Sequence, residues 1–168
     1  MKAKAIVDTS FWIHLVKINL EDKFLELYDI IVPTKVEEEI LFCNTFKFMI
    51  YKPKDIKVYE KLKSLNKIEN INPCVIPKEL SSQISKNSGE LYAISLSKEK
   101  DVIVFIDNGR PYDFCIKNKI KTGTIIDFLV YLKEENQLNL SEIKEKIKIL
   151  ENSISKKLLK DIKKYINM

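Results

Sequence analysis

The chain has 168 residues, 45% of them hydrophobic, which suits one compact domain with a substantial core over residues 1–168. Its 29 basic and 24 acidic side chains give a formal charge of +5, which favours an anionic partner such as nucleic acid. No segment approaches the roughly 18 apolar residues that span a bilayer, so the sequence excludes a membrane-spanning class and predicts a soluble, cytoplasmic protein.

The three cysteines, Cys43, Cys74 and Cys115, lie far apart in the sequence and form no Cys-x-x-Cys pair. An odd and widely spaced set argues against both a disulfide framework and a zinc knuckle. We therefore expect three reduced thiols in the core.

The first part of the chain predicts alternating strands and helices. A strand over 4–8 precedes helices over about 10–17 and 24–28, and a second strand occupies 30–32. Pro33 and Thr34 then begin a helix whose apolar stripe faces the sheet. Residues 44–77 contain three prolines and an amphipathic segment over 58–68, and we interpret them as a helical excursion.

The second part continues the alternation. From Ser88 the pattern predicts a helix, a strand over 102–106, a helix over about 112–118, a short strand near Ile120 and a helix over 125–132. Residues 107–109 could close a hairpin instead, but Pro111 and the lack of a following alternating run argue against it. A long apolar stripe predicts C-terminal helices at about 139–166, with Ser153 as the N-cap of the second.

Near-continuous apolar strands that alternate with helices indicate a parallel sheet joined by right-handed crossovers. The predicted fold class is therefore α/β, a three-layer α/β/α sandwich with a mainly parallel sheet and extra C-terminal helices. In such sheets, ligands bind beyond the carboxyl ends of the strands.

Four acidic residues stand where they can face this edge of the sheet. Asp8 and Asp107 each follow an apolar strand, Glu39 lies beside the apolar stripe of its helix, and Glu90 lies in a first helical turn. Neighbouring carboxylates raise each other's pKa, and a divalent cation removes that cost. Oxygen ligands, with His14 as the only imidazole, favour Mg²⁺ or Mn²⁺ over zinc. Such an ion supports phosphodiester hydrolysis.

Short motifs that contain these acids follow one another along the chain. They are Ile6-Val7-Asp8-Thr9-Ser10, Pro33-Thr34-Lys35-Val36-Glu37-Glu38-Glu39-Ile40, Ser88-Gly89-Glu90-Leu91-Tyr92-Ala93-Ile94, Val104-Phe105-Ile106-Asp107 and Lys121-Thr122-Gly123-Thr124. In this order the chain resembles the PIN-domain ribonucleases, which include the VapC-type toxins of toxin–antitoxin pairs.

The resemblance implies a metal-dependent endoribonuclease in which Asp8, Glu39, Glu90 and Asp107 are the catalytic residues and bind Mg²⁺ or Mn²⁺. It also implies RNA as the substrate, and a role either as a toxin with an antitoxin protein as its partner or as an RNA-processing nuclease. The register of the second motif selects Glu39 over the two glutamates before it. Members of the VapC-like branch, which the chain resembles, often have paired aspartates where this chain has Asp107-Asn108. Asn108 would therefore serve as a neutral ligand, or the fourth acid would be less effective.

Further polar residues are candidates for auxiliary roles. In the resemblance, the hydroxyl of Ser10 helps to position the metal. Arg110 could bind the scissile phosphate, because a guanidinium binds phosphate in a forked geometry, or it could be a surface arginine. Thr122 and Thr124 could contact phosphate, although a turn and a helix cap are the default interpretation. Asp127 could be a fifth acid, although a polar position facing water is simpler.

Each acid also has a structural interpretation. Asp8 or a neighbouring hydroxyl could cap the next helix, Glu39 could lie on a solvated face, and Glu90 could favour the helix dipole. Asp107 has fewer structural explanations because it ends a buried strand. His14 is expected to be packed in the core or in a cleft wall.

Several alternatives concern the whole protein. Lysines concentrate at 47–67 and 144–164, where they could steer an RNA backbone or simply solvate helix faces. The C-terminal stripe could form a homodimer interface. A catalytically silent PIN-like module that binds RNA or protein is the alternative to a nuclease. A receiver domain is disfavoured, because the first strand is not followed by an acidic pair.

Overall fold

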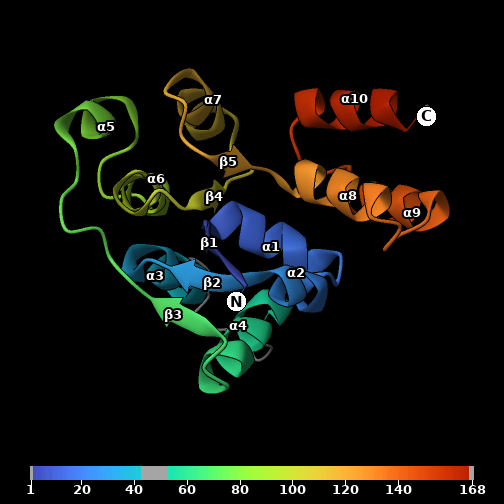
Figure 1. The fold of residues 1–168 in the computed structure, drawn as a ribbon, viewed down its shortest axis with the longest axis horizontal. Coiled ribbons are helices and arrows are strands. Elements are labelled where there is room, and N and C mark those ends of the chain that lie inside the picture. The colour runs from blue at the N-terminus through green and yellow to red at the C-terminus, as the bar shows by residue number, and fades with distance from the viewer. Residues whose placement is uncertain (1, 43–52, 167–168) are drawn as a thin grey trace.

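The computed structural model describes residues 2–42 and 53–166 (Figure 1). Its strands form one five-stranded sheet in the order β3-β2-β1-β4-β5, and every neighbouring pair is parallel. The strands are β1 (Ala3–Val7), β2 (Tyr28–Val32), β3 (Ile68–Asn70), β4 (Ile103–Phe105) and β5 (Thr122–Gly123). The predicted α/β class, with a parallel sheet flanked by helices, is confirmed.

The helices occupy most of the remaining described chain (Figure 1). In chain order they are α1 (Thr9–Lys17), α2 (Glu21–Leu27), α3 (Thr34–Phe42), α4 (Lys54–Ser64), α5 (Lys78–Gln83), α6 (Gly89–Lys100), α7 (Gly109–Lys117), α8 (Ile125–Glu134), α9 (Leu140–Leu150) and α10 (Lys156–Tyr165). A helix after each strand returns the chain to the other end of the sheet, which parallel pairing requires.

The central strand β1 is enclosed on both faces. Ile6 is fully buried and lies in register with Ile31 of β2 and Val104 of β4. Strands that are covered on both sides by helices need apolar residues at successive positions, which explains why β1 ends in three fully buried residues, Ala5 to Val7. The carboxyl ends of β1 and β4 are therefore adjacent.

An aromatic cluster fixes α1 against β4. The ring of Phe11 on α1 lies 4.8 Å from that of Phe105 on β4 and 5.2 Å from that of Phe24 on α2. Phe24 also packs edge-on against Phe105 and Phe128. Tilted and edge-to-face aromatic pairs at these distances are favourable beyond the area that they bury. The start of α1 is thereby held over the carboxyl end of β4.

The sequence analysis missed two elements. The strand β3 joins the edge of the sheet beside β2, inside the stretch interpreted as a helical excursion, and the short helix α5 follows it. Helix α4 begins at Lys54, earlier than the amphipathic segment suggested. Residues 43–52, which belong to the same predicted excursion, lie outside the described residues.

The C-terminal region contains α9 and α10, separated by a turn. Ser155, and not the predicted Ser153, is the N-cap of α10, where its side chain accepts a hydrogen bond from the N–H of Leu158. Ser153 instead donates to the carbonyl of Leu150 at the end of α9. Along the predicted stripe, Ile143 is buried whereas Leu140 is 42% exposed.

The cysteines differ in environment. Cys115 is buried on α7, and burial raises the pKa of its thiol to about 12. Cys74 is exposed, so the prediction of a core thiol is wrong there, because it lies in the loop between β3 and α5 and not in a buried strand or helix. Cys43 lies outside the described residues. In the described part of the chain no helix combines the length and the apolar character that crossing a bilayer requires.

Candidate functional site

Two buried aspartates lie together at the carboxyl edge of the sheet. Asp8 follows β1 and is 1% exposed, and Asp107 lies just beyond β4 and is 6% exposed. The hydroxyl oxygen of Ser10 is 2.9 Å from both carboxylate oxygens of Asp8 and accepts a hydrogen bond of 3.2 Å from the backbone N–H of Asp107. Ser10 therefore connects the ends of two neighbouring strands.

Asp8 has a local structural role as well. It is the N-cap of α1, and its carboxylate accepts a hydrogen bond of 2.8 Å from the N–H of Phe11. Burial raises the pKa of Asp8 well above its ordinary value, the N–H of Phe11 lowers it, and the charges of Asp107 and Glu90 raise it further. Three of the four predicted acids are thus near enough to interact electrostatically.

Asp107 is bound by protein groups on both oxygens. Its Oδ2 lies 2.6 Å from Nδ1 of His14 on α1, and its Oδ1 accepts a hydrogen bond of 2.7 Å from the N–H of Ile125 at the start of α8. The side chains of His14 and Asp107 are 9% and 0% exposed. The sequence analysis expected His14 only as a packed residue and did not identify this contact. The available signal was its spacing of four residues from Ser10, which places both on one face of α1.

Glu39 is held at the first turn of α1 and at the start of α6. Its Oε2 accepts a hydrogen bond of 2.7 Å from the hydroxyl of Thr9, and its Oε1 accepts one of 2.6 Å from the N–H of Gly89. A Cβ atom on Gly89 would lie 2.5 Å from Oε2 of Glu39, so glycine permits the close approach. Thr9 follows Asp8 directly, which brings Glu39 to the same edge of the sheet.

Glu90 lies in the first turn of α6, one residue after the glycine that binds Glu39. The side-chain amide of Asn108 donates a hydrogen bond of 2.7 Å to Oε1 of Glu90. Asn108 follows Asp107 and is the N-cap residue of α7. The asparagine thus connects the third and fourth acids.

The other predicted auxiliary residues have structural roles or are exposed. Thr124 caps α8 in a capping box with Asp127, and Thr122 donates to the carbonyl of Val104 across the β4–β5 pair. Arg110 lies exposed at the start of α7. The geometry brings Asn108 and Ser10 next to the acids, whereas it gives Thr122 and Thr124 the turn and cap roles that were their default interpretation.

The donor chemistry of this edge suits a hard divalent cation, since it presents carboxylate oxygens, a hydroxyl and an amide oxygen. Yet within residues 2–42 and 53–166 no group of three or more Asp, Glu, His or Cys side chains is arranged so that it could hold a metal ion. In the described structure the carboxylate of Glu39 is bound by Thr9 and Gly89, and that of Glu90 by Asn108.

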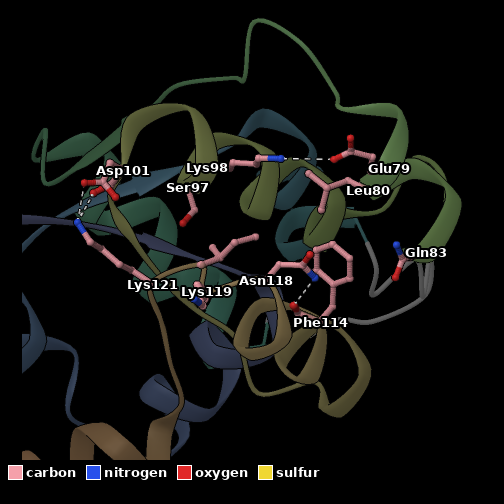
Figure 2. Close-up of a pocket in the computed structure, with 11 residues that line it drawn as sticks. Glu79, Leu80, Gln83, Ser97, Lys98, Asp101, Phe114, Asn118, Lys119 and Lys121 are labelled. Atoms are coloured by element: carbon pink, nitrogen blue, oxygen red, sulfur yellow. Dashed lines mark hydrogen bonds and ion pairs between the residues drawn. The ribbon is translucent and has the colours of Figure 1, made fainter.

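A cavity of about 330 Å³ adjoins the site. Its lining comes from Asp107, the start of α8, and helices α7 and α10, with Lys157 and Leu158 contributed by α10. A different cavity of about 350 Å³ lies at the opposite, amino ends of β4 and β5 (Figure 2). There Lys98 pairs with Glu79 and Lys121 pairs with Asp101, and none of the four acids lines it. We therefore place the candidate site at the carboxyl edge.

The lysine-rich segments are only partly available for an anionic ligand. In the C-terminal segment Lys157 pairs with Asp113 and Lys163 pairs with Glu151. In the first segment Lys63 pairs with Glu37, and Lys47 lies outside the described residues.

The fold and the acids at its carboxyl edge define a class of parallel α/β domain with an acidic site. Residues 4–167 match the PIN domain family, and the chain belongs to it. Members of this family are generally nucleases and usually use divalent metal ions. A comparison with curated proteins found no match to this chain.

Proposed function

We propose that the protein is a Mg²⁺- or Mn²⁺-dependent endoribonuclease whose active site contains Asp8, Glu39, Glu90 and Asp107. The observation that carries the proposal is the pair of buried aspartates at adjacent strand ends, joined through Ser10, with Glu90 close enough to raise the pKa of Asp8. Several carboxylates at one buried place are unfavourable without a cation, and removing that cost is what a bound divalent ion would do.

The proposed roles of the four acids differ with their burial. Asp8 and Asp107 are fixed and would bind the cation directly, with Ser10 orienting the carboxylate of Asp8. Glu39 and Glu90 are half-buried, and their carboxylates would rotate from their present donors toward the ion or a water on it. The bound ion would supply Lewis acidity toward a phosphate oxygen and a lowered pKa for a ligand water.

The decisive experiment measures cleavage of a mixed RNA pool by the wild-type protein with Mn²⁺ and with a chelator. Cleavage in Mn²⁺ only, lost in Asp8→Asn, supports the proposal. Asparagine is as good an N-cap as aspartate, so the variant should retain its helix and unfold at a temperature no lower than that of the wild type. Cleavage that persists in the chelator or in Asp8→Asn would contradict it.

A second candidate function is a catalytically silent module that binds RNA or protein. One observation favours it: the carboxylates are engaged by protein donors. The resemblance to VapC-type toxins adds a second argument, because Asn108 stands where an aspartate is common in those proteins. Such a module would bind RNA equally well with Mn²⁺ and with a chelator and would cut it in neither condition. Gel-shift and cleavage assays on the same samples separate the two functions.

The biological role follows from the resemblance to VapC-type toxins, which suggests a toxin with a protein antitoxin or, failing that, an RNA-processing nuclease. Induced expression in a bacterial host distinguishes the roles. If the protein is a toxin, expression of the wild type should arrest growth and expression of Asp8→Asn should not. If it is a processing nuclease, expression of either should leave growth unchanged.

Sedimentation at several concentrations would test the homodimer suggested by the apolar C-terminal stripe.

A further inference from the structure

Asp107 has a fully buried side chain, and its orientation is set by groups outside the acidic set. Its side chain is 0% exposed, and the N–H of Ile125 and the ring of His14 each bind one of its oxygens. The N–H of Ile125 is a backbone group that every residue except proline supplies. His14 is therefore the side chain that fixes the rotation of the Asp107 carboxylate about its Cβ–Cγ bond.

We propose that His14 is a positioning residue of the metal site, which holds the carboxylate of Asp107 toward Asp8 through a hydrogen bond from Nδ1. This inference rests on the proposed function and extends it to a residue outside the acidic motifs. An oxygen that accepts one hydrogen bond keeps a second lone pair for a cation. Hydrogen bonds to a ligating carboxylate orient it, and loss of such a partner typically weakens metal binding by about 10–100-fold.

The placement of His14 supports a positioning role over simple packing. Any polar neighbour would satisfy a buried imidazole that serves packing alone. The partner of this ring, at 2.6 Å, is the carboxylate of Asp107, one of the proposed metal ligands. Helix α1 contributes three groups to the same edge: Asp8 as its N-cap, Ser10 in its first turn and His14 one turn later. The helix that presents one acid thus also orients the other, so the separation of the two is set by one rigid element.

The test compares substitutions that keep or move the donor. His14→Asn places an amide nitrogen near the position of Nδ1, His14→Gln places it near that of Nε2, and His14→Leu removes it. Mn²⁺ affinity is measured without RNA by electron paramagnetic resonance, which reports free Mn²⁺ directly. We expect His14→Leu and His14→Gln to weaken binding about 10–100-fold and His14→Asn to restore most of it.

A spectroscopic readout accompanies the affinities. Because His14 is the only histidine of the chain, a long-range ¹H–¹⁵N spectrum contains a single imidazole. The metal-free wild-type protein should show a proton on Nδ1, as donation to Asp107 requires. A ring protonated only on Nε2 would overturn the proposal.

The outcomes separate this inference from the function on which it rests. If the wild type binds Mn²⁺ and all three variants bind it equally well, His14 is structural and the nuclease proposal stands. If the Asn and Gln variants weaken binding equally, a donor at Nδ1 is not what matters and the inference fails. If the wild type and Asp8→Asn bind Mn²⁺ equally weakly, the proposed function itself fails.

Discussion

Gly89 has a role at the residue scale that its position in a helix does not suggest. Its backbone N–H binds Oε1 of Glu39, and its missing side chain leaves room for that carboxylate. A Cβ at this position would lie 2.5 Å from Oε2 and 2.9 Å from Cδ of Glu39. The glutamate end is flexible, so it would move rather than disrupt the helix.

We therefore predict that Gly89→Ala lowers Mn²⁺-dependent RNA cleavage by about tenfold or more. The added methyl group would occupy the space in which the carboxylate of Glu39 lies and from which it turns toward the ion, and a ligand misplaced by an ångström loses much of its effect. The free energy of unfolding should change little, because alanine is the better helix former and the clash falls on a flexible side chain. Cleavage rates and urea unfolding measure the two quantities.

Gly109→Ala is the matched control. Gly109 also begins a helix near the site, but a Cβ there would meet nothing within 4 Å. Its cleavage rate should equal that of the wild type. Equal rates for both variants would show that the position of Glu39 does not matter for the chemistry.

The residue-scale predictions from sequence succeeded where local patterns place a side chain. Apolar runs before Asp8 and Asp107 predicted that both would lie at strand ends, and both do. Contacts between segments far apart in the chain carried no such pattern. His14 and Asp107 are separated by 93 positions, and only the assembled fold brings their side chains together.

At the scale of elements, Glu37 joins α3 to α4 and to β3. The hydroxyl of Tyr59 on α4 donates a hydrogen bond of 2.8 Å to Glu37, and Lys63 and Asn70 bind the same carboxylate. Burial acts to raise the pKa of Glu37, but these hydrogen bonds outweigh it and the pKa is lowered. Tyr59 is fully buried, so its hydroxyl depends on this partner.

We predict that Glu37→Ala destabilises the protein by about 1–3 kcal/mol, because it leaves the buried hydroxyl of Tyr59 with a poorer set of partners. Since the pKa of Glu37 is lowered on folding, this contribution is present above the unfolded pKa and is lost as the pH falls through the folded one. Urea unfolding at neutral and acidic pH measures both effects.

Glu38→Ala on the same helix provides the comparison. The side chain of Glu38 is 50% exposed, and among the residues that the structure describes its ion pair is with Lys35. Its removal should cost about 0.5 kcal/mol or less. If the two variants were equally stable, the contacts of Glu37 would not be what attaches α4 and β3.

The elements themselves were predictable to the extent that they are apolar and long. Strand β3 was missed because it has three residues and only Ile68 is buried, so neither an apolar run nor a clear alternation marks it. The cap of α10 was misplaced because both Ser153 and Ser155 are capping residues, and sequence alone does not show which one ends the turn.

At the scale of the whole molecule, the sheet was predictable and the state of its acidic edge was not. Apolar strands alternating with helices allow few arrangements, and a parallel sheet follows from them. The directions of Glu39 and Glu90 depend instead on donors from other segments, Gly89 and Asn108, and on whether a cation competes for the carboxylates.

The raised pKa of Asp8 predicts how the free energy of unfolding changes with pH in the metal-free protein. The folded pKa of Asp8 is raised above its ordinary value of 3.8, so its contribution to stability is fully present below the unfolded pKa and is lost as the pH rises through the folded one. As the pH rises from about 4, the free energy of unfolding of the wild type should therefore fall relative to that of Asp8→Asn. The fall should be about 1.4 kcal/mol for each unit by which folding raises the pKa of Asp8. Saturating Mn²⁺ should reverse the difference, because the ion binds the charged carboxylate of the folded wild type only.

Urea unfolding of both proteins across this pH range, with Mn²⁺ and with a chelator, measures the effect. Parallel curves in the chelator would mean that burial and the neighbouring charges do not raise the pKa of Asp8, and the electrostatic argument for a cation at this edge would fail.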